Sequence, residues 1–373
     1  MGTNLFAFVA LGLAMFSAQA GELFSTEEFP KTDFTKHSVP LTEIYSGGPS
    51  RDRIRPIDKP TFDSISEANE YLDQREPVVV LSIGEQSKAY PLRILLYHEI
   101  INDEIDGHPV FITHCPLCNT AIAFSRKVGN DVLDFGTTGR VRNSNLVMYD
   151  RQTESWWQQF TGDAIVGKYS GTLLTPFKSQ IVSFAQFSKN YPSGLVLSQN
   201  TGFRRYYGKT PYPGYDNPGG IPFLFKREID FRLPPLVRVL ALLDNSNPSQ
   251  IKSTIYPFSY LDKNPLINTT FGDQAILVVG QASMVSTVNK KIIKDSNIIL
   301  TAAAFDRIVD NKELTFQLNN DRIYDDQTHS EWNIFGEAVQ GSLVGAKLKQ
   351  VDKNVHFAFA WLAFHPNAKI INE

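Results

Sequence analysis

Cysteine is nearly absent from this 373-residue chain, which contains only Cys115 and Cys118. Small secreted proteins often depend on several disulfides, but a chain of this length can bury a core large enough to fold without them. The pair is therefore not expected to serve as a framework for the fold. Its C-x-x-C spacing makes a chemical role the more informative interpretation.

An excess of positive charge is also missing, since 36 Lys and Arg residues stand against 39 Asp and Glu residues. Nothing in this balance suggests binding to nucleic acid or to an anionic membrane surface. The sequence contains no P-loop, dinucleotide-binding fingerprint, HExxH motif or recognisable Ser-His-Asp order, so we expect no nucleotide cofactor. Composition leaves the binding partner unknown.

Long hydrophobic runs are confined to the N-terminus. Beyond residue 20 no apolar run reaches the ~20 residues needed to cross a bilayer, so no transmembrane segment is expected in the mature chain. Residues 1–20 are apolar and end in the small-x-small pattern Ala18-Gln19-Ala20 that signal peptidase accepts. A buried N-terminal helix is the alternative, but the polar stretch that follows lacks helical periodicity. We therefore predict a signal peptide and an exported protein, periplasmic or secreted.

A repeated pattern gives the strongest indication of domain organisation. The run YDRQTESWWQQF, which begins at Tyr149, shares the pattern Tyr-Asp-x-Gln-Thr-x-Ser-x-Trp with YDDQTHSEWNIF, which begins at Tyr324. The sequence therefore predicts two tandem copies of one unit, related by a pseudo-twofold axis. The expected order is a signal peptide (1–20), an N-terminal extension with one short helix (21–76), a first repeat that carries the cysteines (77–200), a Gly/Pro/Tyr-rich connector (201–235) and a second, degenerate repeat (236–373).

Local signals predict an α+β fold with more strand than helix. Asp63 or Ser64 is available to cap a helix whose apolar residues follow at helical spacing, and Pro91 stands at a second helix-entry position. The dipeptide Asp106-Gly107, between β-prone runs, predicts a hairpin, and a second hairpin is expected to turn near 151–153. Each copy is expected to end in a helix halted by proline, over SFAQFSKNYP and HFAFAWLAFHP.

The cysteines lie in the stretch ITHCPLCNTAIAF, which begins at Ile112. A strand is expected to end there and Pro116 could begin a helix. Cys115 would then lie at a helix N-terminus, where backbone N–H groups and the macrodipole lower the pKa of a thiol. In a redox pair Cys115 would be the nucleophile and Cys118 the resolving cysteine. The preceding hairpin argues against a thioredoxin fold, which requires a βαβ crossover at this point.

A soft metal ion, copper or zinc, is the leading interpretation of the pair. Two thiolates at this spacing supply half of a tetrahedral or trigonal site, and His98, His108 or His114 could complete it. The aligned stretch of the second copy, ILVVGQASM, has no thiols, which favours function because a fold requirement should apply to both copies. A thiol-disulfide oxidoreductase is the first alternative. A non-catalytic module that binds a ligand or partner and carries a static disulfide is the second.

Other candidate residues differ between the copies or lie in loops that could face a ligand. Arg151 stands opposite Asp326 of the second copy, so it is specific to the first copy and is a candidate catalytic residue. Asp150 has a counterpart in Asp325 and is expected to be a turn residue. The predicted ligand-binding residues come from a glycine-bearing loop and from the connector: Arg140, Asn143, Ser144, Arg204, Tyr212 and Tyr215.

Four long motifs together resemble one known family: AYPLRILLYHEIIND, HCPLCNTAIAF, FGTTGRVRNSNLVMYDRQTESWW and TGFRRYYGKTPYPGYD. This is the family of exported prokaryotic proteins catalogued as domain of unknown function 3179, and the resemblance implies no particular reaction. It favours His98 over His114 as a metal ligand, because His114 departs from the family pattern. The positions that belong to its motifs are Cys115, Cys118, His98, Asn143, Ser144, Asp150 and Arg151.

Overall fold

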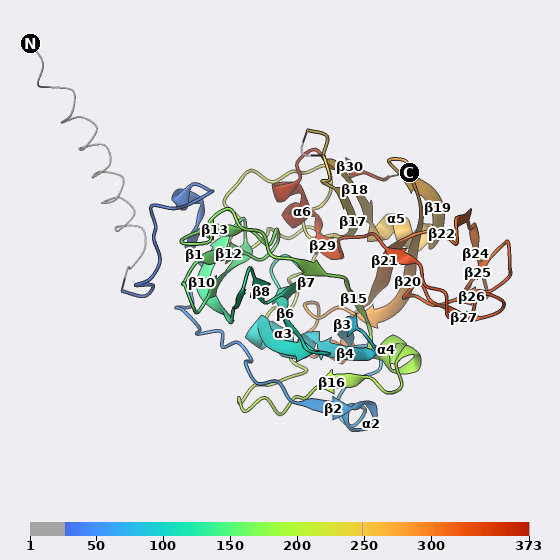
Figure 1. Cartoon of the computed structure of the whole chain (residues 1–373), viewed down its shortest axis with the longest axis horizontal. Helices are drawn as coiled ribbons and strands as arrows, with labels where there is room; N and C mark the ends of the chain where they lie inside the picture. The colour runs from blue at the N-terminus through green and yellow to red at the C-terminus, as the bar shows by residue number, and fades with distance from the viewer. Residues whose placement is uncertain (1–26, 248, 373) are drawn as a thin grey trace, which may run out of the picture.

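The computed structural model describes residues 27–247 and 249–372, so the predicted signal peptide lies outside the described residues. The structure is 42% strand and 11% helix, which confirms the prediction of a β-rich fold with few short helices. In Figure 1 the blue and green strands lie to the left and below, and the orange and red strands lie to the right. Within the described ranges, no helix is long and apolar enough to cross a membrane.

Three sheets and a small ribbon form the half of the chain that contains the cysteines. Their strands are β1 (Tyr45–Ser46), β2 (Phe62–Ser64), β3 (Pro77–Ile83), β4 (Gln86–Pro91), β5 (Ile100–Ile105), β6 (His108–Cys115), β7 (Thr120–Ser125), β8 (Lys127–Val128), β9 (Asp131–Val132), β10 (Phe135–Arg142), β11 (Asn145–Asp150), β12 (Trp156–Gln158), β13 (Ala164–Val166), β14 (Pro176–Phe177), β15 (Ser179–Ser183) and β16 (Leu195–Leu197). The sheet orders are β15-β3-β4-β16-β2, β14-β7-β6-β5 and β1-β10-β11-β12-β13, and the ribbon is β8-β9. The cysteine strand β6 therefore lies inside its sheet, between β5 and β7.

The second half is built from the strands that follow the connector. They are β17 (Arg238–Asp244), β18 (Lys252–Pro257), β19 (Leu266–Phe271), β20 (Gln274–Val285), β21 (Ile298–Asp306), β22 (Ile308–Val309), β23 (Lys312–Glu313), β24 (Phe316–Asn319), β25 (Arg322–Asp325), β26 (Glu331–Trp332), β27 (Ala338–Gln340), β28 (Lys349–Gln350), β29 (Val355–Phe357) and β30 (Lys369–Ile370). The sheet orders are β29-β17-β18-β30, β28-β21-β20-β19 and β24-β25-β26-β27, and the ribbon is β22-β23. These orders match those of the first half strand for strand, except that β1 and β2 have no counterpart among the described strands.

The helices are short, and local chemistry explains where they begin. They are η1 (Leu41–Glu43), α2 (Ile65–Ala68), α3 (Leu92–His98), α4 (Phe184–Asn190), α5 (Phe258–Lys263), η2 (Ile293–Asp295) and α6 (Ala358–Phe364). Ser64 caps α2 through a capping box with Glu67, and Pro91 precedes α3, as the sequence predicts. The predicted hairpin at Asp106-Gly107 joins β5 to β6 and is also confirmed.

The prediction of a helix after Cys115 is wrong. Residues 116–119 instead form a tight turn that joins β6 to β7, with Cys115 paired to Thr120. The turn is closed by the Cys118 N–H, which donates to the Cys115 carbonyl at 3.2 Å. Pro116 occupies the second position of this turn, where its fixed φ is as suitable as at the start of a helix. The two thiols therefore lie at a hairpin tip rather than at a helix end.

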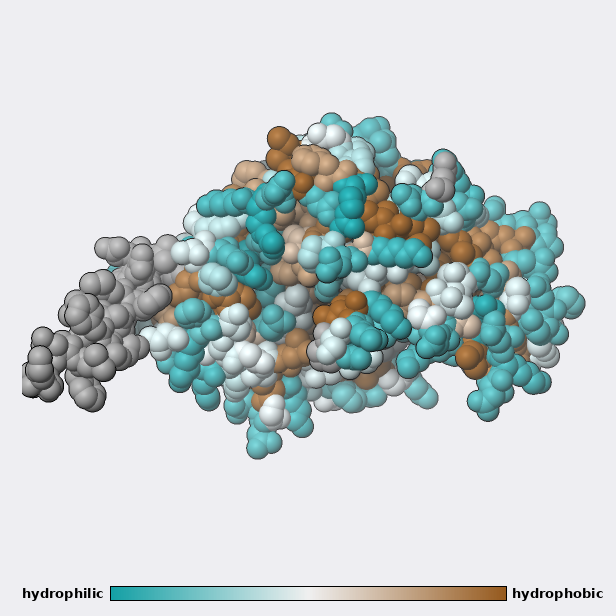
Figure 2. Space-filling model, turned by 90° about the horizontal axis from the view of Figure 1, so that it is seen from above, coloured by the Kyte–Doolittle hydropathy of each residue, from teal (hydrophilic) through white to brown (hydrophobic). Residues whose placement is uncertain are grey.

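The core that surrounds the thiols is shared by both halves. Cys115 and Cys118 pack in one hydrophobic cluster with aromatic residues of the first half and with residues from β29 and α6. The Phe357 N–H donates to the Cys118 carbonyl at 2.9 Å, which fixes β29 against the thiol turn. Figure 2 shows the molecule from above, turned by 90° about the horizontal axis from the view of Figure 1. On this face, hydrophobic residues form separate patches among hydrophilic ones.

Candidate functional site

Two hairpin tips of the first half meet at the cysteines. The β6–β7 turn carries both thiols, and the β10–β11 turn places the Ser144 carbonyl against them. Both thiols donate to this carbonyl, at 3.7 Å from the Cys115 Sγ and 3.4 Å from the Cys118 Sγ. The two cysteines are free, buried and 3.6 Å apart. This is a reduced thiol pair held at close range.

The β10–β11 turn owes its shape to Asn143 and Ser144. Both residues adopt the left-handed conformation, with φ of 53° and 62°. Two consecutive residues with positive φ form the two-residue turn that suits the twist of a hairpin, and asparagine tolerates this conformation better than most residues. The Ser144 hydroxyl donates to the Phe223 carbonyl at 2.6 Å. The structure therefore brings these two predicted ligand-binding residues to the thiols, where Ser144 contributes a backbone carbonyl.

The environment separates the pKa values of the two thiols. Burial raises the pKa of Cys115. Hydrogen bonds from the Cys118 thiol and from the backbone N–H groups of Leu146, Cys118 and Leu117 lower this pKa by more, so it lies below its usual value. Burial raises the pKa of Cys118 well above its usual value, and the neighbouring Cys115 raises it further. Cys115 is therefore the group that ionises first, while Cys118 keeps its proton.

A buried carboxyl, Glu99, completes the cluster. It follows α3 in the left-handed conformation, with φ of 58°, and it lines the same cavity as Cys115. Burial raises the pKa of Glu99 well above its usual value, and the charge of Cys115 adds to the shift. Glu99 is not among the site residues predicted from the sequence. The available signal was a glutamate at a helix end, where glycine or asparagine is the common residue.

Two connector residues that were predicted to bind a ligand, Tyr212 and Tyr215, cover the thiols. The Tyr215 hydroxyl donates to the Leu117 carbonyl at 3.0 Å, inside the thiol turn. Burial raises the pKa of both phenols, and the nearby Glu99 and Cys115 raise that of Tyr212 further. Both tyrosines therefore remain protonated and form an uncharged cover over the site.

The long β20–β21 hairpin of the second half holds this part of the connector in place. The Tyr215 N–H donates to the Val288 carbonyl at 3.0 Å. The connector residue Asp216 forms a buried ion pair with Arg238, with 3.1 Å between Nη1 and Oδ2. The Ser286 hydroxyl donates to the same carboxylate at 2.6 Å. The second half thus supports a site whose thiols belong to the first.

A small cavity of about 100 Å³ gives access to Cys115. Its wall includes Glu99, Thr137, Arg140 and Tyr212. The Arg140 guanidinium forms an ion pair with Glu28, with 2.9 Å between the charged atoms. Arg140, predicted to bind a ligand, therefore lines this cavity, and its charge is partly balanced by Glu28.

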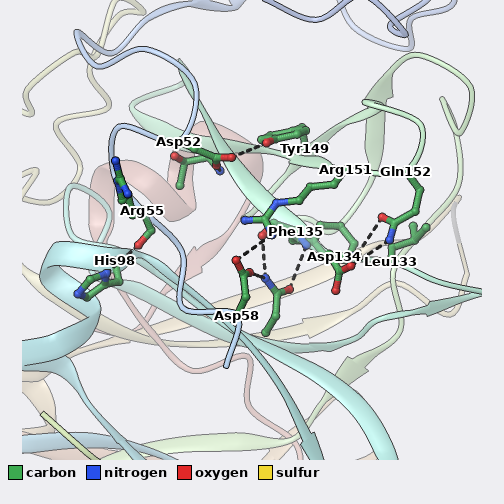
Figure 3. Close-up of polar contacts among 12 residues, drawn as sticks. Asp52, Arg55, Asp58, His98, Leu133, Asp134, Phe135, Tyr149, Arg151 and Gln152 are labelled. Atoms are coloured by element: carbon green, nitrogen blue, oxygen red, sulfur yellow. Dashed lines mark hydrogen bonds and ion pairs between the residues drawn. The ribbon is translucent and has the colours of Figure 1, made fainter. Parts of the chain in front are cut away.

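The structure does not bring His98 to the thiols. Its Nδ1 lies 2.7 Å from the Arg55 carbonyl and its Nε2 lies 2.6 Å from the Tyr207 hydroxyl, so both nitrogens have other partners. Burial lowers the pKa of His98 to about 4, which leaves the imidazole neutral at pH 7. Figure 3 shows the contact between His98 and Arg55. Among the described residues, no group of three or more His, Cys, Asp or Glu side chains could hold a metal ion.

Three further candidates form no hydrogen bond or ion pair with the thiols among the described residues. Arg151 forms an ion pair with Asp58 at 2.8 Å, as Figure 3 shows, and it is not part of the cavity wall at Cys115. His114 is buried, and burial lowers its pKa to about 4, although the nearby Thr120 backbone opposes the shift. Arg204 lies exposed on the connector.

Asp150 behaves as the predicted turn residue. Its carboxylate accepts from the Thr153 N–H at 2.6 Å and from the Trp157 Nε1 at 3.0 Å. In the second half, Asp325 accepts from Thr328 and Trp332 at the same two distances. The matching contacts in the half without thiols indicate a structural role.

Fold and site together define a β-rich protein with a buried, reduced C-x-x-C pair beside a carboxyl group. The chain belongs to the family described as protein of unknown function (DUF3179), whose model matches residues 51–368. Comparison with curated proteins and with solved structures finds no match.

Proposed function

We propose that this protein is a thiol-disulfide oxidoreductase in which Cys115 and Cys118 cycle between dithiol and disulfide. The observation that carries the proposal is the pair of free thiols 3.6 Å apart, whose pKa values are shifted in opposite directions. Groups whose pKa values are pushed apart can take different roles in one reaction. Cys115 would be the nucleophile, Cys118 the resolving thiol and Glu99 the proton carrier.

The proposed reaction transfers two electrons from the thiol pair to a small disulfide, RSSR. The Cys115 thiolate attacks one sulfur of RSSR and forms a mixed disulfide, and the released thiolate takes a proton from the Glu99 carboxyl. Cys118 then gives its proton to Glu99 and attacks the Cys115 sulfur. This step forms the intramolecular disulfide and releases the second thiolate, which takes up the proton that Cys115 had lost to solvent. The pair is oxidised, and RSSR is reduced to two thiols.

Burial supports a small substrate rather than a protein. Cys115 is 3% exposed and Cys118 is fully buried. The cavity at Cys115 has a volume of about 100 Å³. A folded protein could not present a disulfide to this sulfur without displacing the connector. The substrate class that fits this cavity is a small disulfide, or a comparable oxidant with only a few atoms around its reacting bond.

A bound copper or zinc ion is the second candidate function. The 3.6 Å separation of the cysteines suits two thiolates that share one tetrahedral metal at bond lengths of about 2.3 Å. Among the described residues both nitrogens of His98 have other partners and no third His, Cys, Asp or Glu side chain joins the pair, so the two thiolates would be the protein ligands and the remaining positions would be open.

One preparation can separate these functions. The protein should be purified without added metal, and its metal content, free thiols and reduction potential measured together. The redox function predicts no stoichiometric metal and a potential above about −270 mV, in the range of readily exchanged pairs. The metal function predicts stoichiometric copper or zinc that is lost in Cys115→Ser and retained in His98→Ala. A static disulfide, the third possibility, would have a potential below about −300 mV.

We infer further that the two halves are copies of one unit related by a pseudo-twofold axis. The matching sheet orders support this inference, as do the equal contacts of Asp150 and Asp325. Only the first copy carries thiols, and the second supplies the hairpin that holds the connector. Superposition of an experimental structure of 77–200 on 236–372 tests the duplication, which fails if Trp157 and Trp332 fall at unrelated positions.

We also propose that the protein acts outside the cytoplasm, as residues 1–20 suggest. The proposal rests on the apolar run and its Ala18-Gln19-Ala20 terminus. Mass spectrometry of the expressed protein should find a mature chain that begins at Gly21. A full-length chain that stays in the cytoplasm would contradict export while leaving the proposed thiol chemistry open.

A further inference from the structure

A second cavity, of about 370 Å³, lies where the first half meets β29 and α6. It shares no lining residue with the cavity at Cys115. Cavities of this size are typical of small-molecule sites, especially between two structural units. The thiol chemistry makes no use of it, so it requires an explanation of its own.

One wall of this second cavity is aromatic. The ring centroids of Phe160 and Trp361 are 5.7 Å apart, and those of Trp361 and His365 are 4.5 Å apart. Burial lowers the pKa of His365 to about 4, and Lys353 contributes, so the imidazole is neutral at pH 7. Phe124 and Phe177 add further aromatic surface. Such a wall suits a flat, uncharged ring.

Two hydroxyl groups in the lining lack partners. The Thr161 Oγ1 and the Ser179 Oγ are both buried and make no hydrogen bond within the described part of the chain. Both residues line the cavity. A buried hydroxyl without a partner is unfavourable, so these groups are suited to a polar atom of a ligand.

The polar end of the lining holds two ammonium groups that form no ion pair among the described residues. Lys178 and Lys353 both line the cavity, and the Lys178 ammonium donates to the Asp352 carbonyl at 3.0 Å. The Asp352 carboxylate accepts from the Ala304 N–H at 2.9 Å and from its neighbours at 350 and 354, which occupies its oxygens. Asp163 adds one further carboxylate. Neither of the two lining carboxylates, Asp163 and Asp352, forms an ion pair with Lys178 or Lys353, so both ammonium groups remain available to an anion.

We propose that the second cavity binds a small aromatic molecule that carries an acidic group. The ring lies against Phe160 and Trp361, and the acidic group faces Lys178 and the hydroxyls of Thr161 and Ser179. The inference rests on this cavity alone and does not depend on the redox function. It does place the ligand near the thiol turn, because Thr120 contacts the wall residue His356 at 2.9 Å.

The test uses 8-anilinonaphthalene-1-sulfonate, an aromatic anion, and the neutral N-phenyl-1-naphthylamine as probes. The purified full chain should bind the sulfonate at one site per chain, with energy transfer from tryptophan that Trp361→Phe reduces. Lys178→Met should weaken sulfonate binding roughly 1.4- to five-fold, because one exposed charge pair contributes ~0.2–1 kcal/mol. The neutral probe should be unaffected by this change. Lys312→Met, on the exposed β22–β23 ribbon, is the matched control and should change neither.

Filling the cavity provides the second arm of the test. Thr161→Phe should abolish binding of both probes, while the near-isosteric Thr161→Val should fold and weaken the sulfonate by loss of one hydroxyl. Near-ultraviolet circular dichroism checks that each variant is folded. Binding that does not saturate at one site, or sulfonate affinity unchanged in both Lys178→Met and Thr161→Val, would overturn the proposal.

Discussion

At the scale of single residues, Glu99 distinguishes this site from an ordinary pair of buried cysteines. A carboxyl group loses hydration when it is buried, and a left-handed backbone at a non-glycine residue adds about 1–2 kcal/mol of strain. Glu99 carries both costs, since it is 7% exposed and has φ of 58°. Costs of this kind concentrate at functional sites, where the local arrangement serves chemistry rather than stability.

The raised pKa of Glu99 predicts how stability depends on pH. Its folded pKa lies above the ordinary value of 4.5, so as the pH rises above 4.5 the unfolded chain releases this proton first and stability falls. Glu99→Gln keeps the shape and removes the titration. The melting temperature of Glu99→Gln relative to the wild type should therefore rise with pH above 4.5. Glu104→Gln, at an exposed position of β5, is the control and should show no such trend.

Thermal melts followed by circular dichroism across pH 4 to 8 measure this effect. A difference between Glu99→Gln and the wild type that stays constant over the range would contradict the pKa assignment. The same variant also tests the chemistry, because the proposed proton carrier is removed while both thiols remain. Reduction of a small disulfide should slow in Glu99→Gln and should be unchanged in Glu104→Gln.

At the scale of structural elements, local sequence signals predicted several helix starts and hairpins correctly. They failed at the β6–β7 turn beside Cys115. Pro91 and the dipeptide Asp106-Gly107 each permit one local structure, and α3 and the β5–β6 hairpin form there. Pro116 permits two, because the same φ suits the start of a helix and the second position of a turn. The pairing of Cys115 with Thr120 decides between them, and that pairing is a tertiary contact.

The partners of the thiols illustrate why most of the site could not be predicted. The spacing of Cys115 and Cys118 predicts the pair itself, and the connector residues Tyr212 and Tyr215 are among the predicted ligand-binding residues. Glu99 and the backbone of Ser144 reach the sulfurs only because α3 and the β10–β11 turn converge on one hairpin tip. The sequence also predicts His98 as a metal ligand and Arg151 as a catalytic residue, although each side chain has a partner other than the thiols.

The β10–β11 turn provides a test at this scale. Asn143→Val places a β-branched residue at φ of 53°, which should destabilise the protein by about 1–2 kcal/mol. The displaced turn should also weaken the Leu146 N–H contact and raise the pKa of Cys115. Asn143→Gly, which accepts positive φ, is the matched control. Urea denaturation and the pH dependence of iodoacetamide labelling measure the two effects, and an unchanged labelling profile would remove the turn from the thiol environment.

At the scale of the whole molecule, the two halves contribute differently to one site: the first carries the thiols, and the second holds the connector beside them. The β6–β7 connection of the first half is a four-residue turn that carries a cysteine, whereas the corresponding β20–β21 connection is a long excursion through η2. That excursion binds the connector through backbone contacts with Tyr215 and neighbouring residues. The connector beside the thiols is therefore held by contacts with the half that has none.

The buried ion pair between Asp216 and Arg238 is the contact on which this cover most depends. Arg238→Met leaves the Asp216 carboxylate without its cation, which should destabilise the fold by about 3–5 kcal/mol, and the connector should loosen over the thiols. Iodoacetamide labelling of Cys115, measured well below the melting temperature, should become faster. Arg322→Met removes an exposed ion pair with Glu331 and should leave both stability and labelling close to those of the wild type. The double variant Arg238→Met, Asp216→Asn should regain part of the lost stability, because no uncompensated charge remains buried. Equal labelling rates in Arg238→Met and the wild type would show that the connector does not control access to the thiol pair.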